Sequence, residues 1–224
     1  MAAAFRLDRM RKMVGLLGDP QEAYPVIHIT GTNGKGSVAR MVTALLKAQG
    51  LSVGTYTSPH LQRVNERLAW GGEPIADGDL GEVIAALALV KPFLSSPPTY
   101  FELLTAAAYR WFADVAVDVA VVEVGLGGRW DATNVADGVV AVVTNVSLDH
   151  TEVIGPRRLD IAWEKAGIVK AGATLVLGET DAALAGAFAD TAAASVLTRG
   201  TDFGWTSNSL AHGGRLVELF TSEG

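Results

Sequence analysis

The chain has 224 residues, of which 49% are hydrophobic, and a formal net charge of −6. This length and composition suit one large globular domain and exclude a disordered chain. The negative charge without a basic block argues against nucleic-acid partners, and the lack of cysteine excludes disulfides, thiolate catalysis and cysteine zinc sites. Because no apolar stretch is long enough for a signal peptide or a membrane span, we expect a cytoplasmic protein without a membrane partner.

The predicted elements alternate between helices and strands along the chain. An amphipathic helix over 5–17 comes first, and a strand over 26–30 leads through a glycine-rich turn into a helix that ends near Gly50. A strand over 53–57 is followed by a long connection over 59–78 that contains turn signals. Beyond it we expect helices over 79–92, 100–114, 159–169 and 181–194, strands over 117–124, 139–146, 174–178 and 195–198, and a β-hairpin around Gly213-Gly214.

The two longest predicted strands, 117–124 and 139–146, are almost entirely apolar and rich in valine. Such runs are typical of strands that are buried on both faces of a parallel sheet. Together with the alternation of helices and strands, they predict an α/β fold, doubly wound around a mostly parallel sheet, with a C-terminal hairpin. No linker precedes residue 200, so we expect one domain over 1–224.

A glycine-rich stretch, 31–37, lies between the first strand and the helix that follows it. Backbone N–H groups in such a turn, together with the helix dipole, favour phosphate binding. Lys35 can reach a phosphate and Ser37 can ligate magnesium. The spacing departs from the common phosphate-loop pattern, since Gly36 separates Lys35 from Ser37. The alternative is a glycine turn that is capped by Ser37 and carries a solvated lysine.

Polar residues follow four of the predicted strands, at the edge where a parallel sheet binds ligands. Glu123 lies in an apolar strand, where a carboxylate is costly unless it is paired or ligates a metal. A buried salt bridge or an exposed strand end would also explain it. His150 alone is as well explained by a structural role, since magnesium prefers oxygen ligands, and Asp149 could ligate metal or cap a segment. We interpret His28 and His212 as structural.

Several strings of the chain together resemble folylpolyglutamate synthase and bifunctional dihydrofolate synthase, which belong to the Mur ligase superfamily. These strings lie at residues 30–37, 57–61, 65–67, 123–134, 149–151 and 164–168. The match runs in order from about residue 7 to residue 178, and Gly36 is part of the family's own form of the loop. The resemblance implies a fold like the Mur ligase central domain. Members have a second, C-terminal domain, so we expect this chain to be the N-terminal ATPase domain, truncated near its end.

The resemblance also implies a reaction. ATP phosphorylates a carboxylate of dihydropteroate or of a folate glutamate tail, and the amine of L-glutamate then attacks the acyl phosphate. By similarity the catalytic residues are Lys35, Lys165 and His150, and Ser58, Glu123 and His150 ligate Mg²⁺. The ATP-binding residues implied in the same way are Thr32, Asn33, Gly34, Lys35, Gly36 and Ser37.

The resemblance gives roles to residues that would otherwise be read as structural. Lys165 resembles a family lysine that is carbamylated, whereas the sequence without the resemblance favours an ordinary lysine on a helix surface. Phe101 could stack on a flat pterin, and a core position in an amphipathic helix explains it almost as well. The pterin or folate contacts implied by the resemblance are Thr99, Tyr100, Phe101, Glu102, Trp130, Asp131 and Ala132.

Two other functions stay open at this point. A phosphate-loop kinase or ATPase that acts on a small molecule would share the loop, and so would a non-catalytic or truncated nucleotide-binding module. The kinase would not explain Ser58, His150 and Lys165 together. In each case we expect small-molecule partners and a monomer.

Overall fold

A mostly parallel sheet forms the centre of the computed structural model, which describes residues 7–222. The sheet order is β4-β3-β2-β5-β1-β6-β7-β8, with β3 and β4 antiparallel at one edge and the other neighbours parallel. Its strands are β1 (Val26–Thr30), β2 (Val53–Tyr56), β3 (Leu68–Trp70), β4 (Glu73–Pro74), β5 (Val119–Glu123), β6 (Val140–Val143), β7 (Thr174–Leu177) and β8 (Ser195–Thr198).

The central strands are buried on both faces, as their apolar runs predict. Every residue of β5 is buried, and so are four of the five residues of β1. Ile29 pairs in register with Glu123 on one side and with Val142 on the other. This register brings the carboxyl ends of β5, β1 and β6 to one edge, where a parallel sheet binds ligands.

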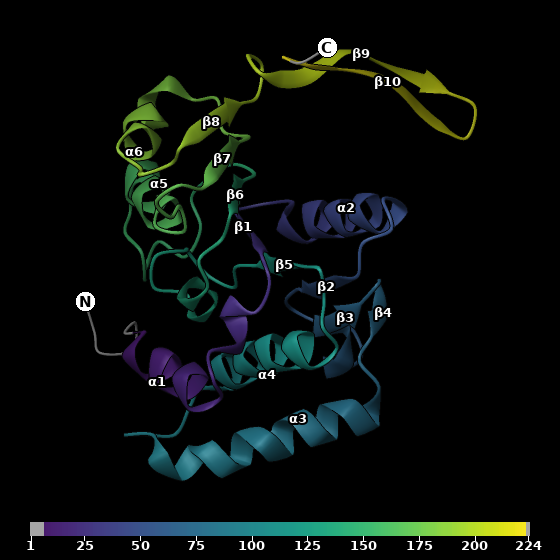
Figure 1. The fold of residues 1–224 in the computed structure, drawn as a ribbon. Helices are drawn as coiled ribbons and strands as arrows, with labels where there is room; N and C mark the ends of the chain where they lie inside the picture. Colours follow the sequence, from purple (N-terminus) through teal and green to yellow (C-terminus); the bar gives the residue numbers. More distant parts are fainter. Residues whose placement is uncertain (1–6, 223–224) are drawn as a thin grey trace.

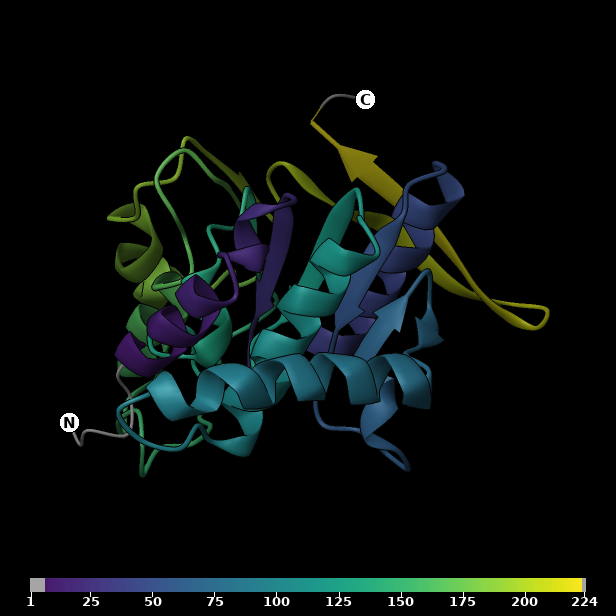
Figure 2. The ribbon, with the colours of Figure 1, turned by 60° about the horizontal axis from the view of Figure 1, so that its bottom comes forward.

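Helices cover both faces of the sheet, so the predicted doubly wound α/β class is confirmed (Figure 1). Helix α2 (Lys35–Ala48) packs on one face against Ile29 and Val121, and the other α-helices and their core lie on the opposite side. There α3 crosses the outer side of α4 (Figure 2). The bounds of these helices are α1 (Asp8–Leu16), α3 (Asp77–Val90), α4 (Tyr100–Asp114), α5 (Arg158–Ala166) and α6 (Ala185–Ala189). Among the described helices, none has the length and apolar character needed to cross a bilayer.

The predicted hairpin is present as β9 (Phe203–Ala211) and β10 (Gly214–Thr221). The chain reverses at Gly213, whose φ of 78° is a conformation that glycine adopts without strain. The hairpin stands off the main sheet in both views (Figures 1 and 2). Most of its residues are exposed, because it packs on no face of that sheet.

Two predicted segments were wrong. The helix over 181–194 is a 3₁₀ turn, Ala182–Leu184, followed by α6, and it stops at Ala189. There the Thr191 hydroxyl donates to the Phe188 carbonyl, and Ala194 N–H donates to Ala173, so tertiary pairing overrides alanine's helix propensity. The connection over 59–78 contains a 3₁₀ turn, Val64–Arg67, and the edge strands β3 and β4, which are too short to show a period.

Other boundaries move by a few residues. The first helix begins at Asp8 within the described part, and the start of the prediction, at residue 5, lies outside the described residues. The helix predicted over 79–92 begins at Asp77 and ends at Val90, where a 3₁₀ turn, Lys91–Phe93, takes over. A further 3₁₀ turn, Pro20–Glu22, precedes β1.

Candidate active site

The glycine-rich loop joins β1 directly to the N-terminus of α2. Gly34 is the N-cap residue in a left-handed conformation (φ 82°), and α2 begins at Lys35. No side chain caps this helix, so the alternative of a turn capped by Ser37 is wrong. The Lys35 ammonium folds back over the loop and donates to the carbonyl oxygens of Gly31 (3.0 Å) and Thr32 (3.4 Å). The first-turn N–H groups of α2 and one lysine therefore share one site, as phosphate binding requires.

A second segment, 144–147, which follows β6, clamps the loop in place. Asn145 is central to this clamp, because its side-chain amide donates to the Asn33 carbonyl (3.0 Å) and accepts from Asn33 N–H (3.0 Å). The Thr144 hydroxyl also donates to the Asn33 carbonyl (2.7 Å). A Cβ on Gly31 would lie 1.8 Å from Thr144 Oγ1, so only glycine fits there. The loop therefore takes its shape from a neighbouring strand end as well as from its own glycines.

Glu123 ends β5 beside this loop and is 4% exposed. Its carboxylate accepts a hydrogen bond from Ser58 N–H at 3.0 Å, and burial raises the pKa of the carboxyl group above its ordinary value. A Cβ placed on Gly36 would lie 3.4 Å from Glu123 Oε2, so the extra glycine lets α2 approach this carboxylate closely. Across residues 7–222 Glu123 forms no salt bridge, so neither a buried ion pair nor an exposed strand end accounts for it.

The side chains around Glu123 are suited to a magnesium ion. A buried carboxylate that forms no salt bridge among the described residues gains from a hard cation, and Ser58, whose N–H donates to it, also carries a hydroxyl oxygen. His150 lies in the loop after β6 with a φ of 49°, and its ring is 3.6 Å from Asp149 Oδ1. In the described chain no three His, Asp or Glu side chains gather closely enough to hold a metal by themselves. Glu123 and Ser58 would thus need further oxygen ligands from phosphate or water.

Lys165 lies on α5 and is buried, with 3% of its surface exposed. Burial lowers its pKa to about 8; the charge of Lys35 lowers it further, and Asp149 and Glu164 act in the opposite direction. Within residues 7–222 it makes no salt bridge. The alternative of an ordinary surface lysine is therefore wrong, and Lys165 is an amine that can be neutral near physiological pH.

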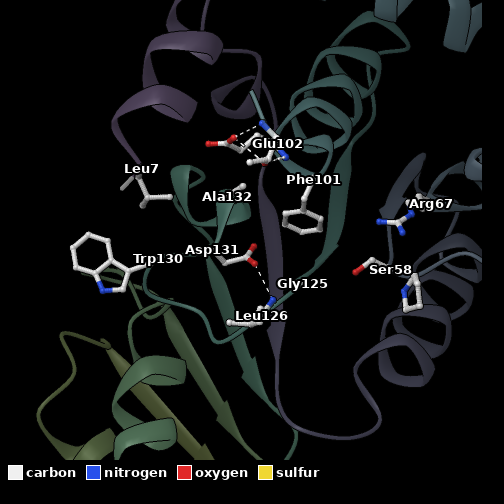
Figure 3. Close-up of a pocket in the computed structure, with 12 residues that line it drawn as sticks. Leu7, Ser58, Arg67, Phe101, Glu102, Gly125, Leu126, Trp130, Asp131 and Ala132 are labelled. Carbon is white, nitrogen blue, oxygen red and sulfur yellow. Dashed lines mark hydrogen bonds between the residues drawn. The ribbon is translucent and has the colours of Figure 1, made fainter. Parts of the chain in front are cut away.

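A cavity of about 360 Å³ is lined in part by Ser58 (Figure 3). It gathers six of the seven residues for which the resemblance implied pterin contacts. The exception is Tyr100, which is 56% exposed and lies under the Arg67 guanidinium, 5.6 Å from its ring centre. The residues lining the cavity are Leu7, Ser58, Pro59, Arg67, Thr99, Phe101, Glu102, Gly125, Leu126, Trp130, Asp131 and Ala132.

Several cavity residues also hold the fold together. Phe101 packs so closely on Gly125 that a Cβ there would lie 2.4 Å from its ring, so its roles as core residue and cavity wall coexist. Glu102 completes the capping box of α4 with Thr99 and accepts from Arg9 of α1 at 2.6 Å. Burial acts to raise the Glu102 pKa, but the bonds from Arg9 and Thr99 outweigh it and lower that pKa overall.

The glycines of the stretch 125–128 serve helix packing. A Cβ on Gly127 would lie 2.8 Å from the Glu164 side chain, and a Cβ on Gly128 would lie 2.8 Å from the Glu164 carbonyl oxygen. Glycines in such a stretch can permit a tight turn or the close approach of another group. The close approach observed is that of α5.

Sequence reasoning missed two residues at this site, Asn145 and Arg67. Asn145 lies two residues beyond the end of an apolar strand, as Glu123 ends one, and that position was the available signal. Arg67 donates to His60 Nδ1 at 2.9 Å and reaches the cavity from a segment predicted to be loop. It lies in the string 65–67 that carries part of the resemblance, but that string gave it no role.

Comparison with known proteins gives one consistent result. Residues 29–212 match the family model of the Mur ligase middle domain. Over 177 residues the chain is 46% identical to the dihydrofolate synthase/folylpolyglutamate synthase of Mycobacterium tuberculosis, covering 73% of this chain and 36% of that protein.

Solved structures agree with the sequence comparison. The M. tuberculosis folylpolyglutamate synthase complexed with ADP aligns with a TM-score of 0.88 at 41% identity, over 95% of this chain and 50% of that one. A complex of folylpolyglutamate synthase with AMPPCP and folate aligns with a TM-score of 0.91 at 37% identity, over 100% of this chain and 57% of that one. The chain therefore spans between about a third and three fifths of the length of these relatives.

Proposed function

This chain belongs to the Mur ligase middle-domain family, and on that basis we propose that it carries the nucleotide and acceptor sites of an ATP-dependent ligase. The proposed reaction joins the amine of L-glutamate to a carboxylate of dihydropteroate or of a folate glutamate tail. The names of its relatives support this, since they are dihydrofolate and folylpolyglutamate synthases with complexes that hold ADP, AMPPCP and folate.

One line of contacts carries the proposal. Ser58 lines the cavity, its N–H donates to Glu123, and Glu123 lies against Gly36 of the phosphate loop. An acceptor in the cavity and the terminal phosphate of ATP on the loop would therefore meet at Ser58 and Glu123. That meeting point is what phosphoryl transfer to a carboxylate requires, because its catalysis is mainly positioning and charge neutralisation.

The residues of the chain then have distinct tasks. Backbone N–H groups of 34–37 hold the phosphates, because those of Thr32 and Asn33 donate to Asn145, and Lys35 exchanges its two loop carbonyls for phosphate oxygens. An oxygen of the acceptor carboxylate attacks the terminal phosphorus and ADP leaves. The amine of L-glutamate next attacks the acyl carbon, phosphate leaves, and the amine loses its proton to solvent. Ser58 and Glu123, with His150 by similarity, would hold Mg²⁺, which supplies positive charge against the phosphate oxygens.

Lys165 fits the proposed carbamylation. A neutral amine can attack carbon dioxide, and a pKa of about 8 leaves a substantial neutral fraction near that pH. The carbamate is an anion, so it would replace the repulsion between Lys165 and Lys35 with attraction. Carbon-13 NMR in labelled bicarbonate tests this, and we expect a carbamate signal that is absent from Lys165→Met.

Glutamate incorporation tests the ligase most simply. Labelled L-glutamate, ATP and Mg²⁺ are incubated with dihydropteroate or tetrahydrofolate and with two proteins, the chain alone and the chain joined to the C-terminal remainder of the M. tuberculosis relative. We expect acceptor-dependent incorporation by the joined protein. Failure with both acceptors would overturn the proposal; phosphorylation of an acceptor without glutamate would then indicate a kinase, and nucleotide binding without turnover a non-catalytic module.

A further inference from the structure

His28 is a buried titratable residue that the proposed mechanism does not use. It lies in the middle of β1, has no exposed surface, and points toward the face of the sheet on which α4 packs, opposite α2. Its Nε2 lies 2.8 Å from the hydroxyl of Thr133, which is itself fully buried. Thr133 belongs to a 3₁₀ turn, Ala132–Val135, that begins directly after the cavity residue Asp131. His28 therefore connects the sheet interior to the cavity wall through one side chain.

The hydrogen bonds around Thr133 have a definite direction. The Thr133 hydroxyl donates to Asp131 Oδ1 at 2.5 Å, and Thr133 N–H donates to the same oxygen at 2.9 Å. A hydroxyl has one proton, so the Thr133 oxygen must accept from His28. Burial and the nearby charge of Lys170 lower the pKa of His28 to about 3, so the ring is neutral and carries a single N–H. That proton must lie on Nε2.

The other ring nitrogen agrees with this assignment. Among the described residues, His28 Nδ1 is buried and has no hydrogen-bond partner. An unpaired acceptor of this kind is tolerated more readily than an orphaned N–H donor, which is what the opposite tautomer would leave inside the protein. The chain of donors therefore runs in one direction, from His28 to Thr133 to Asp131.

The end of this chain is the carboxylate that faces the cavity. Asp131 Oδ2 accepts from Leu126 N–H at 2.9 Å, and Figure 3 shows the carboxylate between Phe101 and Leu126. Burial raises the pKa of Asp131, and the bonds from Thr133 and Leu126 oppose that rise. Oδ1 already accepts two hydrogen bonds from Thr133 and Oδ2 accepts one from Leu126, so of the roughly four lone-pair sites of the carboxylate one on Oδ2 is left for an N–H donor of a bound ring.

We propose that His28 and Thr133 are positioning residues for the acceptor: neutral His28 donates to the Thr133 hydroxyl, which fixes Asp131 as an ionised acceptor for the N–H edge of a flat heteroaromatic ring. This inference rests on the proposed function, which puts such a ring in the cavity. His28 and Thr133 themselves touch neither the cavity nor the nucleotide loop. Their effect should thus appear in acceptor binding and not in nucleotide binding.

Calorimetry with two ligands, folate and Mg²⁺-AMPPCP, tests this on the full chain. Thr133→Val keeps the shape of the side chain but removes the hydroxyl, so Asp131 loses the charge-assisted hydrogen bond that fixes it toward the ring. We expect folate to bind about tenfold more weakly. Thr133→Ser should restore wild-type folate affinity. Thr43→Val, which removes a buried hydroxyl bonded to Ala39 and Thr55, is the matched control and should leave folate affinity unchanged.

The outcomes separate this inference from the proposed function. If the wild-type chain binds AMPPCP but neither folate nor dihydropteroate, the proposed function fails. If the wild type binds folate and Thr133→Val binds it equally well, the positioning role is overturned. It is overturned too if Thr133→Val weakens folate and AMPPCP binding alike, because the substitution then acts on the whole fold.

Nitrogen-15 NMR of the histidine rings in the wild-type chain gives a readout that depends on no variant and no ligand. We expect His28 to be a neutral ring protonated on Nε2, with Nδ1 unprotonated, at pH 7. A ring protonated on Nδ1 alone would reverse the direction of the donor chain and overturn the proposal. A ring protonated on both nitrogens would overturn it as well, because the proposal requires a neutral His28.

Discussion

The phosphate loop and the acceptor cavity are built in opposite ways, although they meet at Ser58 and Glu123. The loop is one contiguous stretch, 31–37, whose binding groups are mainly backbone N–H groups shaped by the segment 144–147. The cavity draws side chains from separate elements, and several of them also hold the fold, as Glu102 holds α1. A site of backbone groups should fail when its shape or its one charge is lost. A site of shared side chains should fail when packing changes.

Removal of the loop's one charge gives the largest expected effect. Lys35→Ala deletes a cation that supplies charge-assisted hydrogen bonds to phosphate, so Mg²⁺-AMPPCP should bind about 100-fold more weakly. Folate affinity should stay at the wild-type value. Calorimetry measures both, and Lys47→Ala, near the far end of α2, serves as the control. Unchanged AMPPCP affinity would remove Lys35 from the site.

A packing change in the cavity should have the converse effect. Gly125→Ala puts a methyl group 2.4 Å from the Phe101 ring, which must then move into the cavity. Folate affinity should fall about 30-fold, a loss typical of an overpacked site, while AMPPCP affinity stays unchanged. Gly81→Ala on α3, where a Cβ meets no atom within 4 Å, is the matched control. Equal folate binding by Gly125→Ala would mean that the acceptor lies elsewhere.

The clamp on the loop can be weakened without touching a charge. Asn145→Ala removes two hydrogen bonds to Asn33, and the looser loop should bind AMPPCP about tenfold more weakly. Folate binding should not change, and Asn208→Ala in the hairpin should change neither affinity. AMPPCP binding at wild-type strength in Asn145→Ala would show that the loop holds its shape by its glycines alone.

The smallest effect concerns the ion pair that attaches α1 to the cavity wall. The folded state lowers the pKa of Glu102, so its stabilisation is present above the ordinary value near 4.5 and is lost as pH falls through the lowered pKa. Glu102→Gln should reduce the free energy of unfolding by about 1 kcal/mol at pH 7, a modest figure because Arg9 is partly exposed.

Urea unfolding at several pH values measures the difference in unfolding free energy between the wild type and Glu102→Gln. It should shrink as the pH is lowered through the acidic range, because protonated Glu102 resembles glutamine. Glu73→Gln, at an exposed position on β4, should show no such pH dependence. A Glu102→Gln difference that persists undiminished in acid would mean that the pair contributes through shape and not through charge.

The same contrast explains what the sequence could and could not predict. The loop, the buried strands and Glu123 depend on local patterns, a glycine-rich turn before a helix and valine-rich runs, and the structure has them where they were expected. The clamp by Asn145, the edge strands β3 and β4 and the chain from His28 to Asp131 depend on contacts between distant segments. His28 was interpreted as structural, and its partner was invisible because 105 residues separate it from Thr133.

Oxygen transfer tests most directly whether the two regions form one reaction site. An acceptor labelled with oxygen-18 in its carboxylate is incubated with ATP, Mg²⁺, L-glutamate and the joined protein, and the released phosphate is analysed by mass spectrometry. If the carboxylate attacks the phosphate held on the loop, each phosphate released during amide formation carries one labelled oxygen. Unlabelled phosphate accompanied by amide formation would contradict an acyl phosphate formed where Ser58 and Glu123 meet.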